Sequence, residues 1–111
     1  YYMSQFEYIL FFRKGRGVKI NNCGTPDILR VPNKKTKGAD GKNLHDTEKP
    51  VELMQILIEN SSQPGDKVLE PFAGIGGVPR ACIRTGRKCV ACELDTEYFN
   101  IMSELVRSES Q

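Results

Sequence analysis

The sequence has no tryptophan, a single histidine and no apolar run that approaches the length of a membrane-spanning segment. Roughly twenty successive apolar residues are needed to cross a bilayer, so the pattern argues against a membrane protein. The apolar N-terminal stretch contains Glu7 and is followed by no small-residue cleavage site, which argues against a signal peptide. We therefore expect a cytoplasmic protein with no membrane partner.

The sequence also lacks the ligand pairs of a metal site. Cys89 and Cys92 are separated by two residues, but both fall in a predicted strand, where residues three apart point to opposite faces. No second cysteine pair accompanies them, and His45 is the only histidine. We expect no bound metal and interpret the cysteines as small buried apolar residues, with Cys82 on a helix and Cys23 in a loop.

The chain of 111 residues is long enough for one small domain with one core. Tyr1 and Tyr2 precede Met3, and a predicted strand begins almost at once. We expect the chain to be a piece of a longer protein.

The net charge is +2, and the charges are unevenly distributed. Residues 1–50 contain ten Lys or Arg against five Asp or Glu, whereas residues 51–111 contain six against nine. The basic residues of the first half gather in two clusters: Arg13, Lys14, Arg16 and Lys19, then Lys34, Lys35, Lys37 and Lys42. Such loops are suited to contact with phosphate groups, and solvated surface loops are the alternative.

Hydrophobic periodicity predicts strands that alternate with helices. Residues 6–13 are aromatic and β-branched, which favours a strand, whereas residues 14–48 have the Gly, Asn, Lys and Pro content of irregular structure. The elements predicted after them are a helix at 50–60, a strand at 67–70, a helix at 77–85, a strand at 88–93 and a helix capped by Asp95 or Thr96. This alternation predicts an α/β fold with a mostly parallel sheet flanked by helices.

A glycine-rich loop follows a predicted buried strand in residues 68–77, VLEPFAGIGG. Glycine lets a ligand approach bare backbone and tolerates positive φ, so Gly74 and Gly76 are typical of a nucleotide-cofactor loop. Glu93 ends the next apolar run about twenty residues later, where such folds place the carboxylate that binds ribose hydroxyls. The alternatives are a tight strand-to-helix turn for the glycines and a solvated strand end for Glu93.

Together with residues 45–53, HDTEKPVEL, these segments resemble the C-terminal half of the amino-DNA methyltransferases, the N6/N4 methyltransferase family. These enzymes transfer a methyl group from S-adenosylmethionine to an exocyclic amine of adenine or cytosine. In one subgroup the cofactor segment comes last and runs His-x-x-x-Lys-Pro, Asp-Pro-Phe-x-Gly-x-Gly, then Gly-x-Glu. That order is kept here, with Glu70 in place of the usual Asp and residues 91–93, ACE, in the last position. Residues 6–15 also resemble the family strand that precedes the cofactor half.

The resemblance implies one partial, Rossmann-like methyltransferase domain over residues 1–111. Within it, residues 14–48 would form a long basic loop and residues 49–111 the cofactor-binding βα units. Glu70 would lie near the amino group of the methionine moiety, and its extra methylene relative to Asp requires a different placement of the carboxylate. Phe72 would pack against the cofactor, with a place in the core as the alternative.

The resemblance also implies that His45, Thr47 and Lys49 belong to a segment that closes over the methionine end of the cofactor. Lys49 would lie near the methionine carboxylate. For His45, a loop histidine bonded to backbone is the alternative.

The family's catalytic motif, an Asp, Asn or Ser followed by Pro-Pro and an aromatic residue, is absent, because the sequence contains no Pro-Pro pair. Methylation of a base amine requires that the base be flipped out and held by such residues. We therefore assign no catalytic residue and expect the chain alone to be inactive. Its catalytic segment would lie upstream or on another chain.

The sequence thus favours the cofactor-binding part of a site-specific DNA methyltransferase, with adenine preferred to cytosine as the target. One alternative is a noncatalytic remnant that binds nucleic acid or a protein partner through its basic loops. Another is a fragment of an RNA or small-molecule methyltransferase. An incomplete sheet would expose an unpaired edge and apolar surface, so we also expect self-association.

Overall fold

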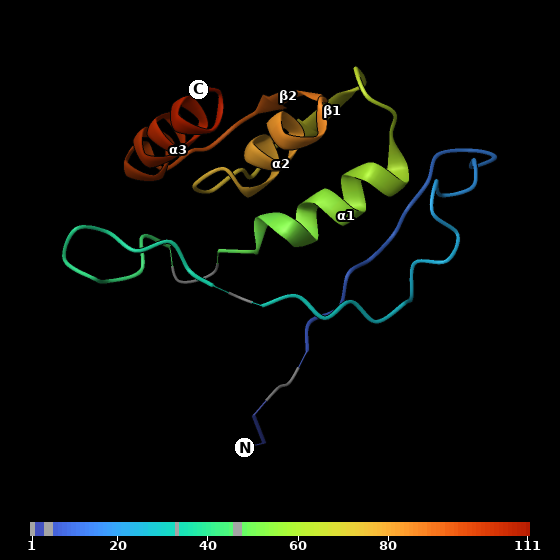
Figure 1. Ribbon diagram of the computed structural model, residues 1–111, viewed down its shortest axis with the longest axis horizontal. Helices are drawn as coiled ribbons and strands as arrows, with labels where there is room; N and C mark the ends of the chain where they lie inside the picture. The colour runs from blue at the N-terminus through green and yellow to red at the C-terminus, as the bar shows by residue number, and fades with distance from the viewer. Residues whose placement is uncertain (1, 4–5, 33, 46–47) are drawn as a thin grey trace.

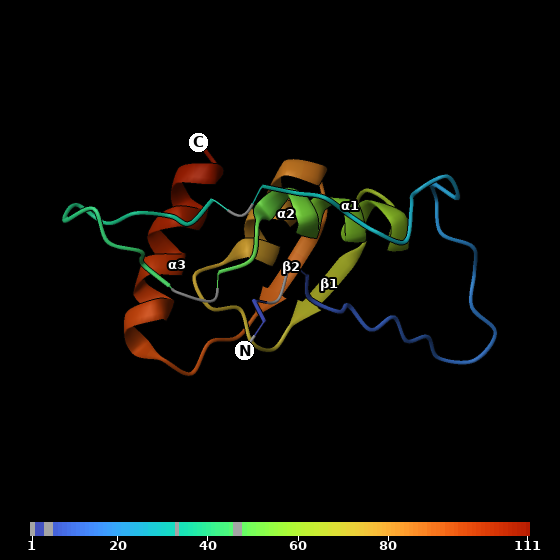
Figure 2. The same ribbon diagram turned by 90° about the horizontal axis from the view of Figure 1, so that it is seen from below.

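The computed structural model describes residues 2–3, 6–32, 34–45 and 48–111. Its elements are, in chain order, α1 (Val51–Ser61), β1 (Lys67–Glu70), α2 (Gly77–Thr85), β2 (Lys88–Ala91) and α3 (Thr96–Glu109). The two strands run side by side in the same direction (Figures 1 and 2), with Lys67 opposite Lys88 and Glu70 opposite Ala91. The predicted α/β fold with parallel pairing is confirmed. The first four elements begin and end within two residues of their predicted bounds, and α3 begins at its predicted cap.

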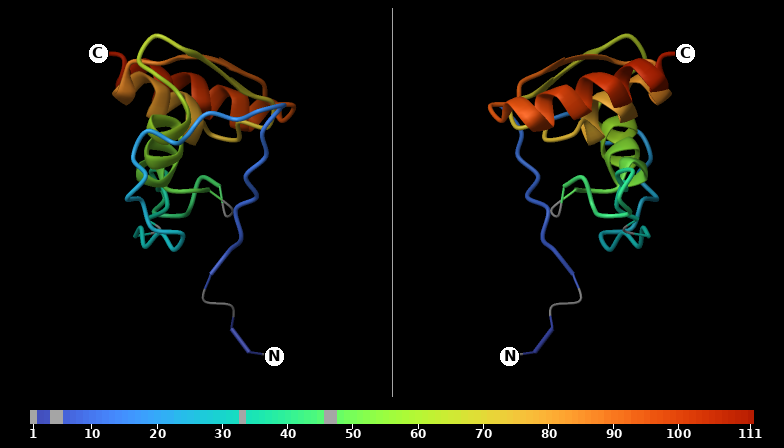
Figure 3. Two further views of the ribbon diagram at one scale, coloured as in Figure 1. Left: turned by 90° about the vertical axis from the view of Figure 1, so that its right-hand side faces the viewer. Right: turned by 90° about the vertical axis from the view of Figure 1, so that its left-hand side faces the viewer.

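The helices form a layer against one face of the sheet. Helix α2 packs on both strands, and α1 and α3 each pack against α2 (Figures 1 and 3). The core between them consists of Val51, Ile58, Ala81 and Cys82, against which Met54, Val68, Val78 and Cys89 pack. This layer accounts for the apolar stripe of α1 and for the burial of Cys82.

The opposite face of the sheet is uncovered in the described part of the chain. Val68 and Cys89 point into the core, so the residues that follow them, Leu69 and Val90, lie on the other face. Leu69 is 69% exposed and Val90 59% exposed, although the two are directly paired neighbours. Two adjacent apolar side chains therefore face solvent at the centre of the sheet.

Local chemistry determines where the helices begin and end. Gly76 and Gly86 bound α2 with φ of 96° and 74°, values that a residue with a side chain rarely adopts. Asp95 caps α3, because its Oδ1 accepts a hydrogen bond from the Tyr98 backbone N–H at 2.9 Å. Within the described residues, no helix is long and apolar enough to cross a membrane.

Residues 6–13 do not form a strand, which corrects the prediction. The segment lies outside the layers of helices and strands (Figure 3), and five of its aromatic and leucine side chains are 65–85% exposed: Phe6, Tyr8, Leu10, Phe11 and Phe12. A strand forms only against a partner strand, and in the described part of the chain β1 and β2 pair with each other alone. The aromatic pattern indicates a tendency to pair, but it does not supply the partner.

Candidate cofactor-binding site

The glycine-rich loop leaves the carboxyl end of β1 and turns directly into α2. In parallel α/β sheets, ligands bind at this edge. The Ala73 N–H donates to the Cys92 carbonyl at 2.8 Å, and the Cys92 N–H donates to the Glu70 carbonyl at 2.9 Å. These bonds continue the sheet pairing beyond the strands and fix the loop to the ends of both β1 and β2.

Glu93 lies beside this loop, held by two backbone donors. Its Oε1 accepts from the Gly74 N–H at 2.7 Å and its Oε2 accepts from the Asp95 N–H at 2.8 Å. An ionised carboxylate has about four lone-pair positions, so each oxygen keeps capacity for a further donor. The arrangement suits two adjacent hydroxyl groups of a ligand, because the carboxylate is already oriented.

Glu70 and Phe72 lie at the same edge of the sheet. Oε1 of Glu70 accepts from the Phe72 backbone N–H at 2.8 Å, so this carboxylate folds back onto the start of the loop. The Phe72 side chain is 88% exposed. The alternative that Phe72 is a core residue is therefore wrong, and its ring is accessible to a planar ligand.

Each of the three loop glycines faces a different part of the molecule. A Cβ on Gly74 would lie 3.5 Å from ring atoms of His45, and one on Gly76 would lie only 2.8 Å from Cγ of Met102 in α3. Gly77 faces the Lys49 carbonyl at 3.5 Å. The space at Gly76 is thus taken by a helix side chain, whereas Gly74 lies between His45 and Glu93.

The segment upstream of α1 contributes unequally to the site. His45 lies over Gly74, but Lys49 points elsewhere: its Nζ is 3.0 Å from Oε1 and Oε2 of Glu7 in an exposed ion pair. Thr47 lies outside the described residues. Of the residues predicted to contact the cofactor, the structure therefore brings His45, Gly74 and Glu93 together and leaves Lys49 paired with an acidic side chain.

Tyr98, in the first turn of α3, is a site residue that sequence analysis did not identify. Its ring packs on the His45 ring, with centroids 4.3 Å apart and planes inclined at 34°. The sequence around Tyr98 signals only a helix start, because Asp95 is a typical cap. Nothing in that local pattern indicates a contact with a loop more than fifty residues away.

The cysteines near the site belong to the core. Burial raises the pKa of the Cys89 thiol to about 12, with the nearby Cys82 contributing further. Burial also raises the pKa of Cys82. Both thiols therefore stay protonated at neutral pH and act as small apolar groups. Cys92, beyond the end of β2, and Cys23 are exposed, so the prediction of buried cysteines is wrong for these two.

Several known proteins are similar to this chain in sequence or in structure. M.HinfI, a type II methyltransferase of Haemophilus influenzae, is 34% identical over 71 residues, which are 64% of this chain and 20% of that protein. The DNA adenine methyltransferase YhdJ of Escherichia coli K12 is 42% identical over 57 residues, 51% of this chain and 19% of that protein. The crystal structure of an M1.HpyAVI–S-adenosylmethionine complex superposes with a TM-score of 0.62 at 32% identity, over 78% of this chain and 42% of that chain.

The chain thus spans about a fifth of the length of these two curated relatives. The sequence profile of the N6/N4 methyltransferase family, described as DNA methylase, matches residues 16–104. The matched region is well over half of the chain and contains the glycine-rich loop, Glu93 and the segment upstream of α1. The chain belongs to the N6/N4 family of DNA methylases.

Proposed function

We propose that this chain binds S-adenosylmethionine at the carboxyl ends of β1 and β2 and serves as the cofactor-binding part of a DNA methyltransferase. The observation that carries the proposal is the Glu93 carboxylate, held by the Gly74 and Asp95 N–H groups beside the glycine-rich loop. The similarity to a solved S-adenosylmethionine complex supports the same ligand.

The residues at this edge fit the parts of the cofactor. Glu93 accepts the two ribose hydroxyls, and the exposed Phe72 ring packs against the ligand. Glu70 attracts the ammonium group of the methionine moiety, and Gly74 lets the chain pass close to the ligand under His45. Gly76 serves the proposed site indirectly, by letting α3 approach the loop through Met102.

The bound cofactor supplies a methyl group activated by its sulfonium. The chain's contribution is to orient that group, and we propose that a catalytic segment upstream or on another chain receives the flipped DNA base. The target amine we propose is that of adenine in preference to cytosine, which is supported by the relative named as a DNA adenine methyltransferase. We further propose that the chain self-associates through the uncovered face of its sheet.

Isothermal calorimetry with S-adenosylmethionine tests the proposal on the purified chain. We expect saturable binding that Glu93→Ala weakens about tenfold or more, because two charge-assisted hydrogen bonds are lost. Glu97→Ala is the matched control, since Glu97 is an exposed carboxylate in the first turn of α3, the helix that follows Glu93. We expect its affinity to equal that of the wild-type chain.

The folded state of each variant is checked by its thermal unfolding temperature, because Glu93 also holds the Gly74 N–H. Absence of binding by a folded wild-type chain would contradict the proposal. Equal losses in Glu93→Ala and Glu97→Ala would contradict the assigned role of Glu93.

A noncatalytic nucleic-acid-binding module is the second candidate, favoured by the exposure of the first cluster of basic residues. Arg13, Lys14, Arg16 and Lys19 are all exposed, as phosphate contacts require. That function predicts DNA binding that falls steeply with salt and needs no S-adenosylmethionine. Titration of labelled DNA at two salt concentrations, with and without the cofactor, separates the two candidates.

A further inference from the structure

The rings of His45 and Tyr98 are in contact, although the two residues lie far apart in the sequence. Tyr98 belongs to the first turn of α3, whereas His45 belongs to the loop before α1. Their ring centroids are 4.3 Å apart. Both residues are half-buried, so the contact lies at the edge of the site rather than in the core.

A series of hydrogen bonds runs from Tyr98 to Gly74, the loop glycine that faces His45. The Tyr98 N–H donates to Asp95 Oδ1 at 2.9 Å, and the Asp95 N–H donates to Glu93 Oε2 at 2.8 Å. Glu93 Oε1 accepts from the Gly74 N–H at 2.7 Å. Gly74 in turn faces the His45 ring, since a Cβ there would lie 3.5 Å from its Cδ2 and Nε2. The orientation of Glu93 and the position of His45 are therefore linked through Tyr98 and through Asp95, the N-cap residue of α3.

The far end of the same loop is anchored independently of Tyr98. The Glu48 side chain is buried, and its two carboxylate oxygens accept from the N–H of Thr36 at 2.6 Å and from the Thr36 hydroxyl at 2.5 Å. Lys35 Nζ also donates to the Glu48 carbonyl at 2.7 Å. Loss of the ring contact would thus leave the start of α1 in place.

We propose that Tyr98 is a positioning residue of the cofactor site. The Tyr98 ring holds the His45 ring over Gly74, and this contact couples the loop before α1 to the Glu93 carboxylate. This inference rests on the proposed function for its effect on cofactor affinity. The role requires an aromatic ring at position 98 but not its hydroxyl group, because the contact is made by the two rings.

Two substitutions at this position separate the ring from the hydroxyl. Tyr98→Phe keeps the ring, and we expect S-adenosylmethionine affinity within about twofold of wild type. Tyr98→Leu removes the ring, and we expect affinity to fall about threefold to tenfold. Phe99→Leu, at the next and partly exposed position of the same helix, is the control and should leave affinity unchanged.

Proton NMR provides a readout that does not depend on the ligand. His45 is the only histidine, so its imidazole C–H resonances can be identified without full assignment. Stacking on Tyr98 should displace them from their position in an unfolded chain, and at constant pH they should return toward that position in Tyr98→Leu. They should stay in place in Phe99→Leu.

Failure of the inference can be distinguished from failure of the proposed function. His45 resonances whose chemical shifts do not change in Tyr98→Leu would show that Tyr98 does not hold the His45 ring in place, whether or not any ligand binds. Resonances that move while the affinity of Tyr98→Leu equals that of wild type would overturn the coupling. A wild-type chain that binds no S-adenosylmethionine refutes both the proposed function and the coupling. The NMR comparison then still tests whether Tyr98 positions the His45 ring.

Discussion

Gly76 is the position of the glycine-rich loop at which an added side chain would be least tolerated. Its φ is 96°, and an added Cβ would lie 2.8 Å from Met102 Cγ, in a side chain that is itself buried. The cost of a substitution therefore has two sources, backbone strain and a clash with α3. Gly65 has nearly the same φ, 90°, but an added Cβ there would meet nothing within 4 Å.

We expect Gly76→Ala to lower the free energy of unfolding by roughly 2–5 kcal/mol, the sum of backbone strain and overpacking. Gly65→Ala should cost only the strain, roughly 1–3 kcal/mol. Urea denaturation of the two variants measures the free energy that each loses. The difference between the two losses is the cost of the contact with Met102. Equal losses would show that Met102 moves aside at no cost.

At the residue scale, the sequence predicted those site residues whose spacing follows from a strand, a turn and a helix. Glu93 and Gly74 meet because each follows one of two neighbouring parallel strands. The Tyr98–His45 contact and the Glu7–Lys49 pair were not predictable. The first joins residues separated by four helices and strands, and the second joins residues separated by a long irregular segment. Local spacing carries no information about such contacts.

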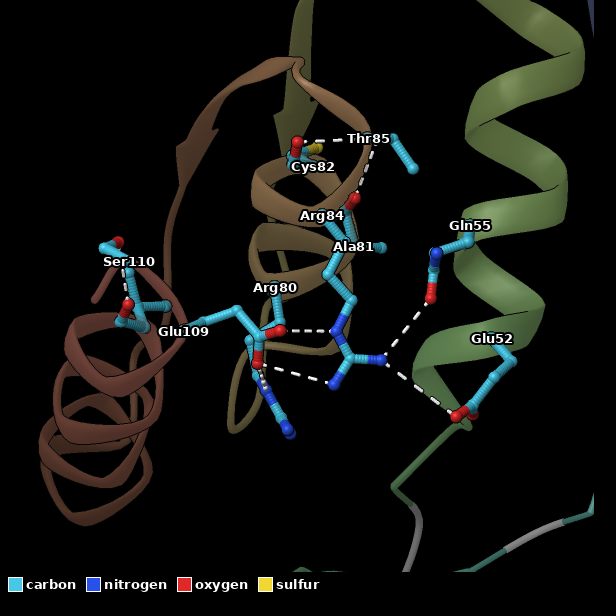
Figure 4. Close-up of polar contacts among 10 residues, drawn as sticks. Glu52, Gln55, Arg80, Ala81, Cys82, Arg84, Thr85, Glu109 and Ser110 are labelled. Carbon is cyan, nitrogen blue, oxygen red and sulfur yellow. Dashed lines mark hydrogen bonds and ion pairs between the residues drawn. The ribbon is translucent and has the colours of Figure 1, made fainter.

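At the element scale, one arginine joins the three helices. Arg84 of α2 bonds to Glu109 of α3, and it lies 4.0 Å from a carboxylate oxygen of Glu52 in α1, as Figure 4 shows. Arg80 adds a second ion pair to Glu109 at 3.3 Å. Glu109 is mostly shielded from solvent, so these pairs are less screened than ordinary surface pairs.

The pairs with Glu109 predict a specific pH dependence of stability. The hydrogen bond from Arg84, together with that from Arg80, holds the pKa of the Glu109 carboxyl below its ordinary value of 4.5. A carboxyl with a lowered folded-state pKa contributes stability that is fully present above its unfolded-state pKa. That contribution is lost as the pH falls through the folded-state pKa.

We therefore expect Glu109→Gln to lower the free energy of unfolding by roughly 1–2 kcal/mol at pH 7, with the difference from wild type vanishing in acid. Glu104→Gln is the control, because Glu104 makes an exposed pair with Arg107 in its own helix and should cost less than about 0.5 kcal/mol. Denaturant unfolding across pH 3–7 is the measurement. A difference that persists unchanged at low pH would contradict the assignment.

Elements were predicted well wherever their boundaries have local causes. Gly76, Gly86 and Asp95 mark helix ends through backbone conformation and capping, and the structure places the ends there. Residues 6–13 have a strong strand pattern but no partner strand in the described part of the chain, so they remain extended and exposed. Strand formation depends on another segment, and a single stretch of sequence cannot specify it.

At the scale of the whole molecule, the sheet is short, and the residues that the structure describes cover only one of its faces. Two strands with one uncovered face form a marginal sheet, because independent stability usually requires three or more strands or packing on a helix. Here the helix layer supplies that packing on one side. Leu69 and Val90 on the other side form a continuous apolar surface next to the unpaired edge of β1.

We expect the chain to self-associate at micromolar concentration, with the face formed by Leu69 and Val90 buried against a second copy. The double substitution Leu69→Thr/Val90→Thr keeps strand propensity while making this face polar, and should shift the chain toward the monomer. Leu94→Ser removes an even more exposed leucine, which lies outside the strands, and should leave the association unchanged. Light scattering over a concentration series measures all three proteins. A wild-type chain that stays monomeric throughout would refute the self-association. An equal effect of Leu94→Ser would show that the copies associate through another surface.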